Sequence, residues 1–403
     1  MTTLRRFVVL AHLVAFGLSC LAATPRAAAQ QDGAQQDSGG RPRRVTPPAD
    51  ADPAPAKPLQ GGDTIELRSD LVTLTVSIVD AKGRPIGSLT PEAFRLFEDG
   101  RAQHIEYFEP VDDPYSLMLV LDTSGSTGDQ VAKMRSAAQE FVDGLGASDR
   151  LGIMTFSRGI EMLGELTNDR AELARHIADV QPTRSKNPRG GRFDENTGTS
   201  FYDALYLACA ESPLSEIKGK SRKAVVILSD CVDSTSSYVF DQITGAVERS
   251  GASVYVLLFD TRAVSDQLLT QPPDYADHIN FSKSQLDRFY DAYGPDNPDR
   301  DRDPLTYTNL ERLEINRALY DLARDQATQL ATRTGGRVYP VTSLSDLGGA
   351  YRAIAAELRT RYSIGYYPTN ERHDGSWRKL RVELPSHPGA QVVTRPGYWA
   401  PKE

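Results

Sequence analysis

The sequence predicts a doubly wound α/β domain, a mostly parallel sheet with helices on both faces, set between two stretches of β structure. Between residues 115 and 361, short runs rich in Val, Ile and Leu alternate with longer segments whose apolar residues recur at helical spacing. Before and after this region, apolar and polar residues alternate one by one, which is typical of strands with one buried face.

The apolar runs are expected to be the strands of the parallel sheet, because a strand covered on both faces is apolar throughout. They are 116–121, 150–156, 222–229, 252–259 and 336–340. The helices expected between them are 130–145, 169–180 with a cap at Thr167 or Asn168, 313–333 and 344–360. Two polar stretches, 184–197 and 263–311, interrupt the alternation, and loops of that length are usually functional or disordered.

The flanking segments predict β structure. Thr90-Pro91-Glu92 fits a short helix start, and Asp99-Gly100 is a hairpin signal between two strands. The expected strands are 71–79, 94–97 and 104–108 before the α/β region, and 362–367, 377–384 and 391–394 after it. A total of about seven is typical of a sandwich. We therefore expect the flanks to pair into one β domain with the α/β domain inserted, two separate β units being the alternative.

The N-terminus resembles an export signal. Arg5 and Arg6 form a basic start, residues 7–23 are apolar, and residues 27–29 offer a small-residue cleavage site. An uncleaved signal anchor is the alternative. Lipidation of Cys20 is disfavoured because Gly17 stands where such sites normally have a leucine-like residue.

The expected domain organisation follows from these patterns. Residues 1–29 are the signal peptide, and 30–62, with almost no large apolar residues, form a disordered linker. The N-terminal β segment spans 63–112, the α/β domain 115–361, and the C-terminal β segment 362–403.

The charge, the length of the apolar runs and the number of cysteines exclude some classes of protein. The formal net charge is −8, and removal of residues 1–29 leaves 43 basic against 54 acidic residues, or −11. Such a protein does not attract nucleic acid or anionic membrane over its whole surface. No segment after the signal approaches the ~18 apolar residues of a membrane span, so a periplasmic or secreted location is expected. Cys209 and Cys231 are then the only cysteines, and two buried thiols are favoured over one bridge.

Candidate ligands for a cation lie at three places in the sequence. Asp122, Ser124 and Ser126 come directly after the run 116–121, so one carboxylate and two hydroxyls lie on the loop that leaves a buried strand. Thr199 lies in a glycine-containing loop before a helix, and Asp230 ends another apolar run. The carboxyl ends of parallel strands share one edge of the sheet, so these side chains can converge. An all-oxygen set suits Mg²⁺, Mn²⁺ or Ca²⁺ rather than zinc.

This arrangement resembles the von Willebrand factor type A (VWFA) domain and its metal-ion-dependent adhesion site. The family pattern is Asp-x-Ser-x-Ser, a threonine in a second loop, and an aspartate after a later strand. The resemblance implies that Ser124 and Ser126 coordinate the cation directly, and that Asp122, Thr199 and Asp230 do so directly or through water. It implies Mg²⁺ as the expected cation, with Mn²⁺ or Ca²⁺ as alternatives, and a free coordination position for an acidic side chain of a partner protein.

The resemblance extends to the flanks. The segments 71–76, 89–100, 362–368 and 395–398 look like those of exported bacterial VWFA-related proteins. One departure is Cys231, where a glycine often follows the last aspartate, and a side chain at that position could narrow the site.

The resemblance implies an adhesion-type binding module rather than an enzyme. Ser124 stands where phosphatases of the aspartyl-phosphate kind need a second carboxylate, and neither Ser124 nor Ser126 lies in a Gly-x-Ser-x-Gly elbow. A structural component of the cell envelope, whose metal only stabilises loops, is the main alternative, and an extracytoplasmic hydrolase is the third. The aromatic residues of 263–311 make that stretch a candidate for partner selectivity.

Overall fold

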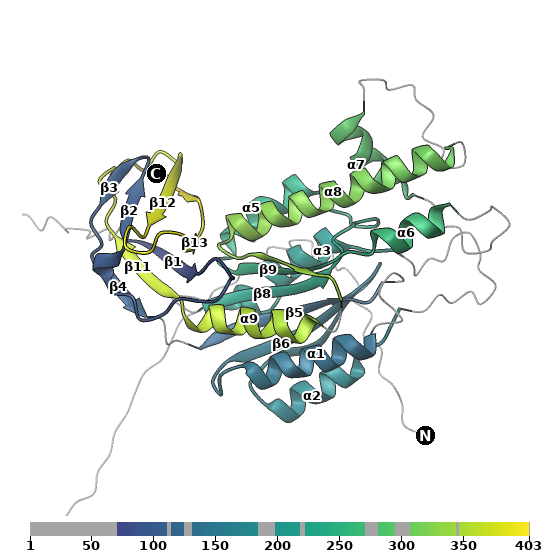
Figure 1. Ribbon diagram of the computed structural model, residues 1–403, viewed down its shortest axis with the longest axis horizontal. Coiled ribbons are helices and arrows are strands. Elements are labelled where there is room, and N and C mark those ends of the chain that lie inside the picture. The colour runs from purple at the N-terminus through teal and green to yellow at the C-terminus, as the bar shows by residue number, and fades with distance from the viewer. Residues whose placement is uncertain are drawn as a thin grey trace, which may run out of the picture. The chain divides into compact units, whose positions relative to one another are not determined.

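The structure, a computed structural model, describes residues 71–110, 114–124, 131–183, 198–217, 222–270, 281–294, 307–343 and 346–402. The expected signal peptide, the expected linker and the stretch 184–197 lie outside these residues. Within them, the predicted fold class is confirmed: a mostly parallel six-stranded sheet with helices on both faces is flanked by two smaller β-sheets (Figure 1).

The central sheet has the strand order β10-β9-β8-β5-β6-β7. Its parallel strands are β5 (Tyr115–Asp122), β6 (Arg150–Phe156), β8 (Arg222–Ser229), β9 (Ser253–Phe259) and β10 (Val338–Val341). All five correspond to predicted apolar runs. The edge strand β7 (Ile160–Thr167) pairs antiparallel with β6 and was not predicted. Most of its side chains are only partly buried, so it lacks the continuous apolar pattern of the others.

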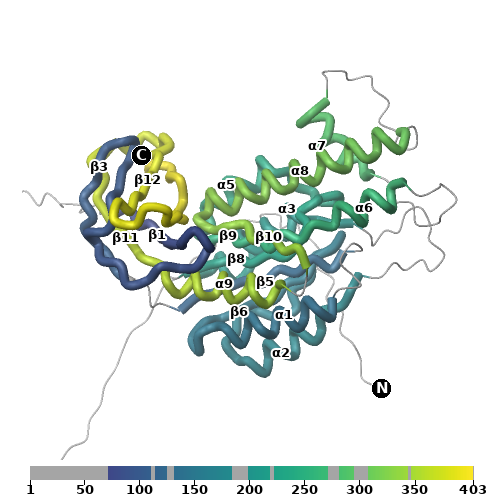
Figure 2. Tube along the Cα trace, viewed as in Figure 1, coloured from purple at the N-terminus to yellow at the C-terminus, as the bar shows by residue number. Residues whose placement is uncertain are grey.

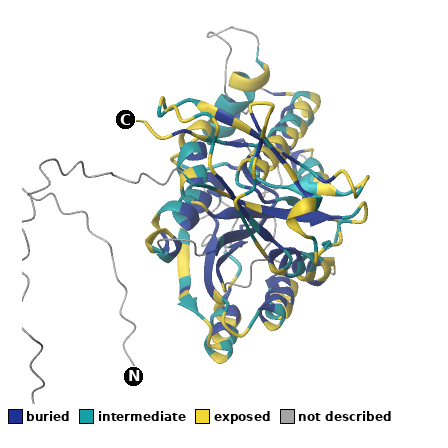
Figure 3. Ribbon diagram, turned by 90° about the vertical axis from the view of Figure 1, so that its left-hand side faces the viewer, coloured by how far each residue is buried: buried dark blue, intermediate teal, exposed yellow. Residues whose placement is uncertain are grey.

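Helices cover both faces of this sheet (Figure 1). One face packs against α1 (Val131–Gly144), α2 (Arg170–Asp179) and α9 (Leu347–Arg359). The other packs against α3 (Phe201–Tyr206), a π-helix (Leu207–Glu211), α4 (Pro213–Glu216), α5 (Phe240–Arg249) and α8 (Asn309–Arg333). On these helices, the exposed residues lie mainly on the surfaces turned away from the sheet (Figure 3).

Helices also occupy part of the stretch 263–311, which the sequence pattern left without regular structure. They are α6 (Arg262–Leu269) and α7 (Lys283–Tyr293). Leu269, Leu286 and Leu319 join these two helices and α8 in a small separate core. None of the helices in the described parts of the chain is long and apolar enough to cross a membrane.

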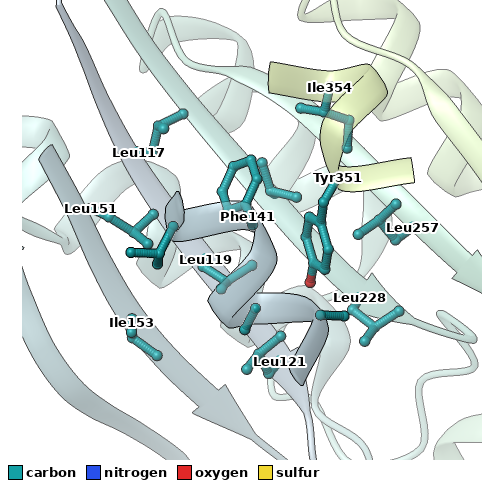
Figure 4. Close-up of a cluster of buried hydrophobic side chains, with 14 of the residues drawn as sticks. Leu117, Leu119, Leu121, Phe141, Leu151, Ile153, Leu228, Leu257, Tyr351 and Ile354 are labelled. Carbon is teal, nitrogen blue, oxygen red and sulfur yellow. The ribbon is translucent and has the colours of Figure 1, made fainter. Parts of the chain in front are cut away.

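Strand β5 explains why the central strands are apolar throughout. Leu117, Leu119 and Leu121 point into the core on one side of the sheet, and Met118 and Val120 point into the core on the other. Figure 4 shows the first three beside Phe141 of α1 and Tyr351 of α9, whose ring centroids are 4.9 Å apart. Polar side chains are excluded from such a strand until it reaches the edge of the sheet.

Two helix starts differ from the expected ones. Helix α2 is capped by Asp169, whose side chain accepts hydrogen bonds from the backbone N–H groups of Ala171 and Glu172. The expected cap at Thr167 or Asn168 was therefore wrong. Helix α8 begins earlier than predicted because Thr308 and Glu311 form a reciprocal capping box.

The flanking strands from both ends of the chain pair with each other. One sheet has the order β13-β1-β11-β4, and the other has the order β14-β12-β2-β3. Their bounds are β1 (Val72–Val79), β2 (Arg95–Glu98), β3 (Arg101–Gln103), β4 (Tyr107–Pro110), β11 (Tyr362–Tyr366), β12 (Trp377–Glu383), β13 (Gln391–Val393) and β14 (Gly397–Trp399). Figure 2 shows the early and late segments interleaved, and they share one hydrophobic core.

Some local expectations for the flanks were wrong. The hairpin at Asp99-Gly100 joins β2 to β3, not to the expected strand 104–108, and both turn residues have positive φ angles of 48° and 82°. By contrast, the expected short helix start is present: residues 91–93 form a 3₁₀ helix with Thr90 at its N-cap and Pro91 in its first turn. The short strand β14 was not predicted.

Arg361 connects the inserted domain to the flanking strands. It is 3 % exposed, and its guanidinium donates to the Ser77 hydroxyl of β1 at 3.0 Å and to the Ser253 hydroxyl of β9 at 2.8 Å. It also donates to the Gly335 carbonyl at 2.8 Å and lies 3.8 Å from the Glu357 carboxylate. One buried side chain thus satisfies polar groups from both parts of the molecule.

Replacing Arg361 by methionine should lower the free energy of unfolding by about 3–5 kcal/mol, because buried polar partners then lose their donor. Urea unfolding of the two proteins measures the difference. Arg352→Met is the matched control, since its ion pair with Glu140 is exposed and should contribute less than about 1 kcal/mol. Equal losses in the two variants would contradict the assigned role of Arg361.

Candidate metal-binding site

Two aspartates lie at the carboxyl edge of adjacent parallel strands. Asp122 is the last residue of β5, and Asp230 directly follows β8, with Leu121 and Leu228 in register between the two strands. Asp122 is 0 % exposed and Asp230 is 5 % exposed. The alternation of buried strand and covering helix thus places two carboxylates in the interior at one edge of the sheet.

The Asp122 carboxylate is held by groups from both strands. The Ser229 hydroxyl at the end of β8 donates to Oδ2 at 2.6 Å, and the Ser124 backbone N–H donates to Oδ1 at 2.9 Å. Ser124 is buried beside it. Ser126, the third residue of the predicted motif, lies outside the described residues.

The Asp230 carboxylate is held by hydrogen bonds from its own loop and from the end of the neighbouring strand β9. The Thr261 hydroxyl, just after β9, donates to Oδ2 at 2.5 Å, and the Val232 backbone N–H donates to Oδ1 at 3.0 Å. The Tyr320 hydroxyl of α8 lies 2.7 Å from the Thr261 oxygen. Because the Thr261 proton is used toward Asp230, Tyr320 donates to Thr261, and this chain of hydrogen bonds orients the carboxylate.

Thr199 belongs to the same edge of the sheet. Its backbone N–H donates to the Ser234 hydroxyl at 2.8 Å, and its carbonyl accepts from the backbone N–H groups of Ser234 and Thr235 at 2.8 and 3.1 Å. The preceding Gly198 has φ of 135°, and a Cβ at that residue would lie 2.5 Å from the Thr235 side chain. The Thr199 loop therefore packs directly on the loop that follows Asp230.

Burial makes ionisation of both carboxylates costly, and the charge of Asp122 adds to that cost at Asp230. Burial raises the pKa of Asp122 above its ordinary value. Burial, followed by the negative charge of Asp122, raises the pKa of Asp230 from 3.8 to about 7. Like charges in an interior of low dielectric repel strongly, so this edge of the sheet favours either a proton or a cation.

Cys231 adopts a conformation that glycine reaches more easily. Its φ is 63°, in the left-handed region. The side chain is 1 % exposed and belongs to the hydrophobic core beneath the loop. Burial, followed by the negative charges of Asp230 and Asp122, raises the pKa of the Cys231 thiol. Cys209 and Cys231 are both buried free thiols.

Helix α7 holds two of the loops together. The Arg288 guanidinium of α7 donates to the Asp233 carboxylate at 2.5 Å and to the Asp233 carbonyl at 2.7 Å. Asp233 in turn accepts from the Tyr202 backbone N–H at the start of α3, at 3.2 Å. The Ser282 hydroxyl, the cap of α7, donates to the Ser234 carbonyl at 2.7 Å. An insertion helix is thus anchored to the loops that carry Thr199 and Asp230.

Several residues of this site were not found from the sequence. Ser229 and Thr261 stand at the ends of apolar runs, so their position at strand ends was a usable signal. Tyr320 and Arg288 lie on helices far along the chain, and only the packing of α7 and α8 brings them to the site. Asp233 lies three residues after Asp230, and its buried carboxylate pairs with Arg288.

The donor set fits a hard divalent cation. Two carboxylates and nearby hydroxyl oxygens are available, and such ligands suit Mg²⁺, Mn²⁺ or Ca²⁺. Among the described residues, no group of three or more His, Cys, Asp and Glu side chains is placed to hold a metal. A cation at this edge would therefore need hydroxyl ligands in addition to Asp122 and Asp230.

Residues 117–232 match the family model of the von Willebrand factor type A domain. The match spans β5 through β8 and includes both aspartates. The protein therefore contains a VWFA domain, as the sequence motifs suggested. No curated protein matches the chain.

Solved structures with a similar fold come from several bacteria. An aerotolerance-related membrane protein from Bacteroides fragilis is 18 % identical, with 60 % of this chain and 98 % of that chain covered and a TM-score of 0.36. BatB from Bacteroides thetaiotaomicron is 17 % identical, with 60 % and 98 % covered and a TM-score of 0.33. The von Willebrand factor domain of the pilus tip protein Mfa5 from Porphyromonas gingivalis is 11 % identical, with 61 % and 95 % covered and a TM-score of 0.34. At these values the similarity carries no inference about function.

In the presence of EDTA, the free energy of unfolding should fall as the pH rises from about 4 to about 7. Over this range Asp230 is protonated in the folded protein and ionised in the unfolded chain, so unfolding releases a proton. Thermal unfolding across this pH range measures the slope. Asp230→Asn should reduce the slope, because an amide does not ionise, whereas the exposed Asp143→Asn should keep it. Identical slopes in all three proteins would refute the assignment.

Arg288→Met should cost about 3 kcal/mol of stability, because the Asp233 side chain, only 1 % exposed, then loses its cationic partner. The double variant Asp233→Asn/Arg288→Met should recover part of the loss, since no buried charge remains. Chemical unfolding of the wild type, the single variant and the double variant tests this. A double variant less stable than Arg288→Met would show that the charge pair is not the cause.

Proposed function

We propose that the protein is an exported binding module that captures a partner protein through a divalent cation held at the carboxyl edge of its VWFA domain. The observation that supports this most is the pair of buried carboxylates, Asp122 and Asp230, on adjacent strands. Two like charges in the interior are costly, and a cation between them offsets their repulsion.

The residues that would hold the cation are Asp122, Ser124, Ser126, Thr199 and Asp230. Mg²⁺ is the expected ion because all of these ligands are hard oxygens, and Mn²⁺ or Ca²⁺ would also suit them. A bound cation would supply a Lewis-acidic position that can accept a carboxylate oxygen of the partner. The hydrogen bonds from Ser229 and Thr261 would keep the two aspartates oriented for this task.

The alternative is a structural protein of the cell envelope whose metal only ties loops together. The loops already hold one another through direct contacts, namely Thr199 with Ser234 and Arg288 with Asp233. A cation is therefore not needed for their cohesion, which favours the binding function. On this proposal EDTA abolishes association with the partner and leaves the fold intact. In both cases EDTA removes the stabilisation that a bound cation adds and so lowers the melting temperature, but on the alternative there is no association with a partner to lose.

We also propose that the protein is exported and that it binds its partner without catalysing a reaction. The basic start, apolar stretch and small-residue site within residues 1–29 support export to the periplasm or the medium.

The insertion around α7 remains a candidate for partner selectivity. Because Arg288 anchors the site, deleting this segment would disturb the cation ligands as well. Substitution of an outward residue such as Tyr293, 51 % exposed, is the cleaner way to test selectivity.

Calorimetric titration of Mg²⁺, Mn²⁺ and Ca²⁺ into the EDTA-stripped protein should show saturable binding at one site. Asp122→Ala should lose this binding, whereas Asp143→Ala, at an exposed residue of α1, should keep it. At a cation concentration about 100 times Kd, binding should add about 2.7 kcal/mol of stability to the wild type alone. Absence of binding to the wild-type protein would refute the proposal.

A further inference from the structure

Both tryptophans of the chain are exposed and lie side by side on one β-sheet. Trp377 begins β12, Trp399 ends β14, and the two residues are directly opposite each other in the antiparallel pair. They are 37 % and 62 % exposed, and their ring centroids are 5.2 Å apart at an interplanar angle of 67°. Tryptophan is highly buried on average, so two exposed indoles in contact point to an interaction surface.

The local backbone accommodates this pair. A Cβ on Gly397 would lie 2.5 Å from an indole ring atom of Trp377, so the ring lies against the backbone of β14 where that residue has no side chain. The indole is therefore held on the surface by the sheet itself. Its exposure is a property of the folded strand and not of a loose terminus.

Basic residues continue the same outer face. Along β12, buried residues alternate with outward ones, and the outward positions after Trp377 are Lys379 and Arg381. The Arg381 guanidinium lies 4.3 Å above the ring of Phe97 on the neighbouring strand β2, where Arg95 is also exposed. Glu383 forms an ion pair with Arg381. Asp99, directly after β2, is exposed and accepts a hydrogen bond from the Lys379 backbone N–H at 2.9 Å. This face therefore combines aromatic rings with three basic and two acidic residues, an excess of one positive charge, although the whole chain has a formal net charge of −8.

We propose that this tryptophan face, formed by Trp377, Trp399, Phe97, Lys379, Arg381 and Arg95, docks on a membrane surface that contains anionic phospholipid. Tryptophan favours the boundary between water and hydrocarbon because its ring is apolar and its N–H can remain hydrated. Lysine and arginine at the same level attract lipid phosphates. The combination fits a lipid headgroup layer better than nucleic acid, whose binding depends on many phosphate contacts. This proposal does not rest on the cation site.

The test uses the fluorescence of the two tryptophans, which report on this face because the chain has no others. The full mature chain is mixed with vesicles of phosphatidylcholine alone, or of an equal mixture of phosphatidylcholine and phosphatidylglycerol. EDTA is present in both, so that a bound cation cannot bridge the protein to lipid phosphate. We expect a blue shift and co-sedimentation only with the mixed vesicles, and loss of both at high salt.

Matched variants locate the interaction. Lys379→Glu should weaken partitioning by about 30-fold, which corresponds to about 2 kcal/mol for a change of two charges near an anionic surface. Trp399→Ala should weaken co-sedimentation as well. Lys133→Glu and Tyr293→Ala change exposed residues of α1 and α7 and should leave it unchanged.

Each of several results would overturn the proposal. These are no response to either vesicle, an equal response to both vesicles that Lys379→Glu does not alter, and weaker binding in the control variants than in Lys379→Glu. A stronger response to the soluble polyanion polygalacturonate than to mixed vesicles would also overturn it, and would assign the face to an acidic polysaccharide.

Discussion

The burial of β5 and β8 on both faces is the constraint from which the rest of the structure follows. Helices on each side leave no polar environment along these strands, so every side chain from Leu117 to Leu121 is apolar. Polar groups can appear only where the strands leave the layer of helices. That requirement gathers Asp122, Ser229 and Asp230 at one edge, although Asp122 is separated from the other two by more than a hundred residues.

The polar groups at this edge form a connected network. Asp122 and Asp230 are oriented by hydroxyls from the ends of β8 and β9, and Tyr320 of α8 supports the second of these. The loop beyond Asp230 is fixed by Arg288 of α7. Negative charge is therefore concentrated where the surrounding protein supplies mainly hydroxyls and amides, and compensation must come from a proton or from a bound ion. Rigid support of this kind is what a site needs to bind without first paying for ordering of its loops.

Much of the fold and part of the site could be predicted from the sequence, for identifiable reasons. Buried strands such as β5 are long, apolar and bounded by polar residues, so their ends and the aspartates that follow them are visible in the sequence. Strand β7 and strand β14 are short or half-exposed and leave no such pattern. The cap at Asp169 depends on which of three neighbouring polar side chains reaches the backbone, which spacing alone does not decide. The roles of Arg288 and Tyr320 depend on how α7 and α8 pack, and this packing is not encoded locally.

The pairing of the two flanks has a consequence for how the chain reaches this structure. The Thr394 hydroxyl bonds the Thr75 carbonyl across 319 residues of sequence, and β1 finds both of its neighbouring strands only at the far end of the chain. During synthesis β1 is made long before its partner strands β11 and β13, so both of its edges stay unpaired until the end of the chain is made. Such long-range pairing is slow, and unpaired edges favour aggregation. Folding of the inserted domain reduces this difficulty. Its strands are closer to one another in sequence, and once they have paired, Tyr115 and Arg361 belong to the same folded domain. Once it has formed, the remaining loop to be closed is short, and the entropy cost of joining the flanks is correspondingly small.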